Sequence, residues 1–252
     1  MKVTIESLRV PIPPLQWFDE SLRQISKCME EPRPVSIGGG TAYRFSKESV
    51  ENAAFLKLAR YVSGLHAGTT LLNGGYFQEL CTLQRTLDEF HEDILYLSLP
   101  LHGYEKTPEH ATFLDAFWEE EPDYSKFSGH QKNRHQIPRK KIRSDLSKVT
   151  SNGKPDNGSI ASSAYLSRIY SGYVHGAAPQ LLELFDHITS NYRVTGFADS
   201  PFAKDHSDDF QNQFFRGVLS VSIVAKLQGS NSVAQEAYEI HNQLEPLFHG
   251  HG

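Results

Sequence analysis

Apolar residues recur at spacings of three and four along most of this chain, and this periodicity restricts the possible fold more than any other feature. The segment 50–62 shows the pattern clearly, with apolar residues at Val50, Ala53, Ala54, Leu56, Leu58, Ala59 and Val62. Such spacing places the side chains on one face of an α-helix. No comparable run alternates as strands do. The sequence therefore predicts an all-α, multi-helix bundle of about seven or eight helices.

Two polar or proline-rich segments interrupt the predicted bundle. Prolines 11, 13 and 14 exclude a helix, so we expect residues 1–14 to form an extended arm. Residues 122–158 are polar and basic, and we interpret them as an insertion or linker that holds a short helix near Pro138 to Val149. With 252 residues, the chain is expected to form a single helical domain, 1–252.

The segment from Ala164 to His187 is predicted to be the central helix, with a bend at Gly176 and Pro179. It carries Arg168 and His175, which are seven residues apart. Because seven residues are close to two helical turns, both side chains should lie on the same face. This helix is the first place to look for a functional site.

Charge restricts where a nucleic acid could bind. The 30 acidic residues outnumber the 25 Lys and Arg residues, for a formal net charge of −5, so the chain as a whole does not attract phosphate backbones. A local basic cluster lies in the polar insertion, at Lys132, Arg134, Arg139, Lys140, Lys141 and Arg143. This cluster is either a nucleic-acid contact or a solvated loop leading into a short helix.

Several other classes of protein lack support in the sequence. Cys28 and Cys81 form no Cys-x-x-Cys pattern, and we expect two buried free thiols. His91, Glu92 and Asp93 are consecutive on a predicted helix and cannot all face one ion, so neither a metal nor any other cofactor is expected. The longest apolar run, 217–225, is too short to span a membrane, and we expect a cytoplasmic protein that does not enter membranes.

Two short motifs on different predicted helices resemble those of a known family. Arg85-x-x-x-Glu89 lies on one long helix, and Ser171-Gly-Tyr-Val-His175-Gly on a later one. Together they look like a family of uncharacterised bacterial helical proteins, which is itself similar to HEPN domains (higher eukaryote and prokaryote nucleotide-binding). The resemblance covers roughly residues 46–187. HEPN domains are helical bundles of toxin–antitoxin and antiphage defence systems.

The resemblance implies a candidate activity. Active HEPN members use an Arg and, after four to six residues, a His as a metal-independent ribonuclease site that is completed at a dimer interface. Arg168 and His175 match that spacing, and so do Arg60 with His66 and Arg85 with His91. The seven-residue step of Arg168 and His175 returns to the same helical face, whereas a six-residue step does not. Arg168 and His175 are therefore the preferred catalytic candidates, with the arginine on the phosphate and the histidine as general acid and base.

Four further residues are expected to support this pair: Arg85, Glu89, Ser171 and Tyr173. The expected partners are RNA, a second copy of the chain in a homodimer or other homo-oligomer, and a partner protein of the same defence module. The alternative is a non-enzymatic protein–protein interaction module, in which Arg168, His175 and Glu89 form a buried network. The two hypotheses differ in a simple observable, because a catalytic pair must be accessible and a structural network must be enclosed.

Overall fold

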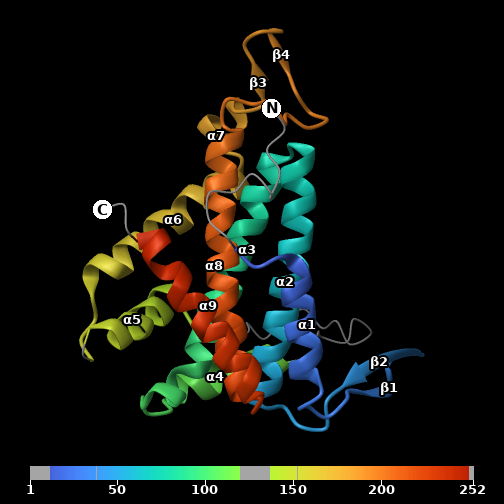
Figure 1. Cartoon of the computed structure of the whole chain (residues 1–252), viewed down its shortest axis with the longest axis vertical. Helices are drawn as coiled ribbons and strands as arrows, with labels where there is room; N and C mark the ends of the chain where they lie inside the picture. The colour runs from blue at the N-terminus through green and yellow to red at the C-terminus, as the bar shows by residue number, and fades with distance from the viewer. Residues whose placement is uncertain (1–11, 38, 120–136, 152, 250–252) are drawn as a thin grey trace, which may run out of the picture.

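The computed structural model describes residues 12–37, 39–119, 137–151 and 153–249. Within these ranges the chain forms an all-α bundle, as its periodicity predicts, with nine α-helices (Figure 1). The helices are α1 Leu15–Ser26, α2 Val50–Gly74, α3 Phe77–Ser98, α4 Pro108–Trp118, α5 Arg139–Thr150, α6 Asn157–His175, α7 Ala178–Leu182, α8 Ala203–Leu227 and α9 Asn231–His249. A short 3-10 helix, Leu99–His102, follows α3.

Three long helices, α2, α3 and α8, pack against one another at the centre of the bundle (Figure 1). Helices α1 and α9 pack against α8, and α4 contacts α2. One apolar cluster runs through α1, α2, α3, α8 and α9, with Phe18, Tyr61, Leu87 and Phe214 essentially inaccessible to solvent. Burial of these side chains is the main driving force for the arrangement.

Helices α5 and α6 lie on the outer side of α3 and pack against each other (Figure 1). Of the residues of α6, Tyr170 alone is buried. The helix is capped at its start by Asp156, whose carboxylate accepts hydrogen bonds from the backbone N–H groups of Gly158 and Ser159 at 3.0 and 3.2 Å. Because α6 buries so little of its surface, most of its side chains face solvent.

The predicted central helix is broken rather than bent. Helix α6 ends at His175 because Gly176 adopts a left-handed conformation, with φ of 65°, and the Ala177 N–H donates to the Gly172 carbonyl at 2.8 Å. Pro179 then occupies the first turn of the five-residue helix α7, where its missing N–H has no cost. Residues 183–187 are not helical, so the prediction of one helix to His187 was wrong.

Two small antiparallel hairpins were not predicted. Strands β1 (Arg33–Ile37) and β2 (Gly40–Arg44) pair with each other, and so do the two-residue strands β3 (Phe185–Asp186) and β4 (Asn191–Tyr192). Each strand is too short to show a convincing alternation of apolar and polar residues. Both hairpins lie at the periphery of the helical bundle (Figure 1).

The expected arm and insertion are described only in part. Of the arm 1–14, residues 1–11 lie outside the described residues, and 12–14 are not helical. In the segment 122–158, helix α5 forms close to the predicted boundaries, and α6 begins at Asn157, inside the predicted linker. The expectation of one domain for the whole chain stays a prediction.

Candidate functional site

Arg168 and His175 both lie on the exposed surface of α6. Their seven-residue separation places them on one face, about 10 Å apart along the helix axis at 1.5 Å per residue. Neither forms a hydrogen bond or an ion pair with another part of the chain that the structure describes. The pair is therefore open to solvent, which does not fit a network enclosed within the bundle.

Arg85 and Glu89 hold helices together rather than touching Arg168 or His175. Arg85 Nη1 donates to the backbone carbonyl and to the hydroxyl of Ser167 on α6, at 2.7 Å each. Its Nη2 forms an intrahelical ion pair with Glu89 at 3.2 Å, and Glu89 also lies 3.7 Å from Arg139 of α5. The two residues thus join α3 to α5 and α6. Arg85 holds α6 in place through Ser167, which directly precedes Arg168.

Of the other two supporting candidates, Ser171 is half-buried and Tyr173 belongs to a different polar cluster. The Tyr173 hydroxyl lies 2.8 and 3.0 Å from the two carboxylate oxygens of Glu183. Glu183 Oε2 is 3.1 Å from His206 Nε2, and His206 Nδ1 is 3.3 Å from the Cys81 thiol. The partly buried Tyr173 therefore directs its hydroxyl toward a Cys–His–Glu chain that connects α3, α8 and the end of α7.

The order of these groups matches that of a nucleophilic Cys–His–carboxylate triad, but their environment does not suit that chemistry. Cys81 is 1% exposed, and burial raises the pKa of its thiol well above the ordinary value, with Glu183 and Asp209 adding to the shift. The thiol stays protonated at neutral pH, whereas a nucleophilic cysteine needs a lowered pKa and access to its substrate. We interpret this chain of groups as a buried structural network.

Cys28, in contrast, is exposed, so the prediction of two buried thiols was wrong for Cys28 and correct for Cys81.

Most of the described basic cluster is engaged in ion pairs. Arg139 Nη1 lies 2.5 Å from Asp93 Oδ1, and Arg143 Nε lies 2.7 Å from Glu92 Oε1. Lys141 and Lys148 both pair with Asp145 on the same helix, at 3.0 and 2.7 Å. The expectation that Arg139, Lys141 and Arg143 present free charge to a nucleic acid is therefore not supported. Lys140 is exposed, and Lys132 and Arg134 lie outside the described residues.

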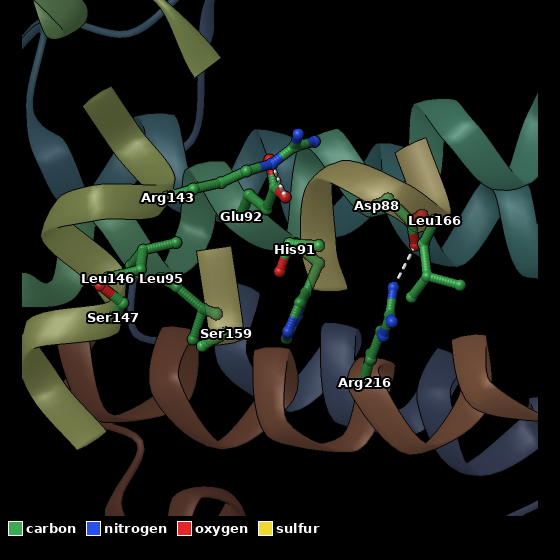
Figure 2. Close-up of a pocket in the computed structure, with 11 residues that line it drawn as sticks. Asp88, His91, Glu92, Leu95, Arg143, Leu146, Ser147, Ser159, Leu166 and Arg216 are labelled. Atoms are coloured by element: carbon green, nitrogen blue, oxygen red, sulfur yellow. Dashed lines mark hydrogen bonds and ion pairs between the residues drawn. The ribbon is translucent and has the colours of Figure 1, made fainter. Parts of the chain in front are cut away.

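A polar pocket of about 260 Å³ lies where α3, α5, α6 and α8 meet (Figure 2). Arg216 reaches from α8 to the Asp88 carboxylate, which also accepts a hydrogen bond from Gln213 at 2.7 Å. Arg143 extends over Glu92 from α5. The remaining lining residues are His91, Leu95, Leu146, Ser147, Ser159, Ser163 and Leu166.

Burial dominates the electrostatics of this pocket. It raises the pKa of Asp88 and of Glu92, and the adjacent arginines oppose the shift in each case. The His91 side chain points toward α8 (Figure 2), and its Nδ1 lies 2.8 Å from the Ser220 hydroxyl. Burial, together with the positive charge of Arg216, lowers the pKa of His91 to about 3. The imidazole is therefore neutral near pH 7.

The pattern of polar residues along α3 indicates part of this pocket in the sequence, although no short motif marks it. Asp88, His91, Glu92 and Leu95 follow the spacing of one helical face, so three polar residues occupy a stripe that a bundle would ordinarily fill with apolar residues. Arg216 could not be assigned in this way, because only the packing of α8 on α3 brings it to Asp88. Asp93 faces a different direction, toward Lys57 at 2.8 Å.

Two further features concern the described residues as a whole. Among the described residues, no group of three or more His, Cys, Asp and Glu side chains is arranged to hold a metal ion. In the same residues, every helix is too short or too polar to cross a membrane.

Comparisons with family models, with curated proteins and with solved structures find no match to this chain.

Proposed function

We propose that this protein is a HEPN-like, metal-independent ribonuclease of a bacterial toxin or antiphage defence system, with Arg168 and His175 as its catalytic residues. The observation that supports this proposal best is their accessibility. Both side chains are exposed on one face of α6, and neither is engaged by another described residue. An RNA strand can therefore approach both groups without a rearrangement of the bundle.

The residue types suit cleavage of a phosphodiester by the 2'-hydroxyl of the same strand. Histidine can accept a proton from the 2'-hydroxyl or donate one to the leaving 5'-oxygen at neutral pH. Arginine can donate two parallel hydrogen bonds to the phosphate and stabilise the charge that develops in the transition state. Arg168 and His175 are two turns apart on one face of α6, so both side chains can approach the same stretch of an RNA strand. Because the resemblance to HEPN domains implies a site that is completed at a dimer interface, the proposal includes a second copy of the chain.

The ion pairs of α5 restrict the surface that binds the strand. Because Arg139 and Arg143 are held by Asp93 and Glu92, we assign the phosphate contacts to Arg168 and Lys140. Each phosphate contact with a single strand contributes about −0.7 to the slope of log affinity against log salt concentration. A strand bound by few cations should therefore show a shallow salt dependence.

The direct test is cleavage of a labelled single-stranded RNA pool in EDTA by the purified protein and by Arg168→Ala and His175→Ala. Matched controls are Arg23→Ala and His187→Ala, which remove the same residue types at other exposed positions. We expect the parent and both controls to cleave, and each α6 variant to lose at least about a hundredfold in rate. Inactivity of the parent, or equal cleavage by the α6 variants, would contradict the proposal.

A second candidate function, a non-enzymatic protein–protein interaction module, is favoured by one specific observation. Exposed apolar side chains concentrate on α7 and the β3–β4 hairpin, at one end of the bundle (Figure 1). They are Leu181, Leu182, Phe185, Ile188, Tyr192 and Val194. An apolar surface of this kind is typical of a protein-binding site. Sedimentation of the parent and of Ile188→Asp over a range of protein concentrations tests whether the chain self-associates through this apolar surface. A parent that is monomeric at every concentration would exclude a second copy of the chain as the partner.

A further inference from the structure

Gly172 lies between the two candidate catalytic residues, four residues after Arg168 and three before His175 on α6. Residues three and four apart on a helix are neighbours on its surface, with about 5–6 Å between their Cβ atoms. The space next to Gly172 is filled by the side-chain amide of Gln180 from α7. A Cβ added to Gly172 would lie 2.7 Å from Gln180 Cδ, 2.8 Å from Oε1 and 2.9 Å from Nε2. The Gln180 amide therefore lies between Arg168 and His175 on the same surface.

This amide is available to a ligand. Gln180 is partly exposed, and neither its amide oxygen nor its amide nitrogen forms a hydrogen bond with another described residue. The buried polar atoms that lack a partner in the described part of the chain belong to other residues, so both amide atoms of Gln180 contact solvent. A carboxamide offers two N–H donors and one carbonyl acceptor. With the exposed side chains of Arg168 and His175, it places three hydrogen-bonding groups in a row.

Contacts to two neighbouring helices hold the backbone that carries this amide. Gln78 Nε2 donates to the Gln180 carbonyl oxygen at 2.7 Å and joins α7 to α3. Just past the end of α7, Glu183 accepts a hydrogen bond from the Tyr173 hydroxyl of α6 at 2.8 Å. A residue whose backbone is fixed in this way loses less conformational freedom when it binds a ligand.

We propose that Gln180 is a third residue of the α6 site and that its amide donates a hydrogen bond to the scissile phosphate of RNA. The inference rests on the proposed function, which assigns Arg168 to the phosphate and His175 to the 2'-hydroxyl. A group between these two residues faces the phosphate that the 2'-oxygen attacks.

The cleavage step gives this donor a specific role. The 2'-oxygen forms a bond to phosphorus, and the bond from phosphorus to the 5'-oxygen breaks. His175 takes the proton of the 2'-hydroxyl, and water protonates the leaving 5'-oxygen. Negative charge builds up on the non-bridging phosphate oxygens in the transition state, and an N–H donor placed beside them stabilises that charge. Loss of the donor should therefore lower kcat more than it raises KM.

The proposal also gives a reason for the glycine at position 172. Glycine is unfavourable within a helix compared with alanine. Alanine at this position would push the Gln180 amide aside, because the added Cβ would lie less than 3 Å from three of its atoms. Gly172→Ala therefore displaces the amide without removing it, in a variant whose helix propensity is higher than that of the parent.

Steady-state cleavage of a labelled single-stranded RNA in EDTA tests the proposal. Gln180→Leu removes the amide, and Gln180→Glu keeps its shape but replaces the N–H donors by a negative charge. We expect both changes, and Gly172→Ala, to lower kcat at least about tenfold. Gln243→Leu, at an exposed glutamine of α9, is the control and should cleave at the parental rate. A parental kcat in any of the first three variants would overturn the proposal.

Binding of an uncleavable strand separates this inference from the ribonuclease proposal. Fluorescence anisotropy with a 2'-fluoro strand of the same sequence, which lacks the attacking hydroxyl, should show weaker binding by Gln180→Glu than by the parent, by at least about threefold. Such weakening without any cleavage of natural RNA retains Gln180 as a phosphate contact and removes the ribonuclease. Cleavage that depends on Arg168 and His175 but not on Gln180 does the reverse. A parent that neither binds nor cleaves would overturn both.

Discussion

Arg85 of α3 donates two hydrogen bonds of 2.7 Å to Ser167 of α6, one to its carbonyl and one to its hydroxyl. Ser167 is adjacent to Arg168, so this contact fixes the part of α6 that carries the candidate catalytic arginine. Since Tyr170 is the single buried residue of α6, the helix depends on such polar contacts for its position more than the central helices do.

Replacement of Arg85 by alanine should therefore loosen α6. Hydrogen bonds from a charged, partly buried donor typically contribute about 1–3 kcal/mol, and we expect the free energy of unfolding to fall by about 1–2 kcal/mol. Amide hydrogen exchange should accelerate in α6 more than in α8. Arg168→Ala, which removes an exposed arginine on the same helix, should change stability by less than about 0.5 kcal/mol. Equal stability of the Arg85 variant and the parent would show that α6 is held by other contacts.

Gly75 is predicted to be irreplaceable for steric as well as conformational reasons. It ends α2 with φ of 72°, and an added Cβ would lie 2.2 Å from the backbone nitrogen of Ala198. Gly103 is the matched control, because it has φ of 80° and a Cβ added there would meet no atom within 4 Å. Both Gly→Ala changes carry the cost of a left-handed conformation, about 1 kcal/mol, and Gly75→Ala carries the backbone clash in addition.

We expect Gly75→Ala to lower the urea midpoint clearly more than Gly103→Ala does, with the difference measuring the clash. Similar midpoints would mean that the segment around Phe197 and Ala198 moves aside at little cost. The Phe197 N–H donates to the Gly75 carbonyl at 2.9 Å, and this bond argues against such movement.

Stability should depend on pH through His91. Its pKa is lowered to about 3 in the folded state, from an ordinary value of 6.5, because burial and Arg216 disfavour the imidazolium. Between these values the unfolded chain binds a proton that the folded chain does not, so the free energy of unfolding falls as pH decreases from about 6.5 toward 3. The slope from one such group approaches about 1.4 kcal/mol per pH unit.

Asp88 and Glu92 make the opposite contribution to the pH dependence of stability. Their raised pKa values mean that, on acidification, the folded chain binds protons at a higher pH than the unfolded chain does. The contribution of His91 is therefore isolated by comparing the parent with His91→Asn in urea unfolding at several pH values. The difference in stability should be constant above about pH 7.5 and should shrink below about 6.5. A difference that does not change with pH would contradict a neutral, buried His91.

The two cysteines should differ sharply in reactivity. Cys28 is exposed, whereas Cys81 is buried against His206 and its thiol pKa is raised by burial, Glu183 and Asp209. In a thiol titration with a disulfide reagent, one equivalent should react in the folded protein and the second only after denaturation. Cys28→Ser should leave no rapid reaction. A fast second thiol would show that Cys81 is accessible, and would restore the triad as a nucleophilic candidate.

The helices were largely predictable because their causes are local. Apolar spacing marks the buried faces of α2, α3 and α8, and Gly75, with its left-handed conformation, ends α2. The break at Gly176 was predicted as a bend, since sequence alone does not reveal whether a glycine adopts a left-handed conformation. The two hairpins were missed because strands of two to five residues give no periodic signal.

The candidate sites depended on the tertiary structure, because their partners are far apart in the chain. Arg139 and Arg143 looked available for nucleic acid, but α5 packs on α3, where Asp93 and Glu92 neutralise them. Arg216 meets Asp88 across 128 residues, and His206 meets Cys81 across 125. A charge on a helix is visible in the sequence, but whether it faces solvent or a carboxylate is decided only when the helices pack. Local signals in the sequence therefore specify the helical architecture, whereas the packing of the helices determines which polar residues remain available to a ligand.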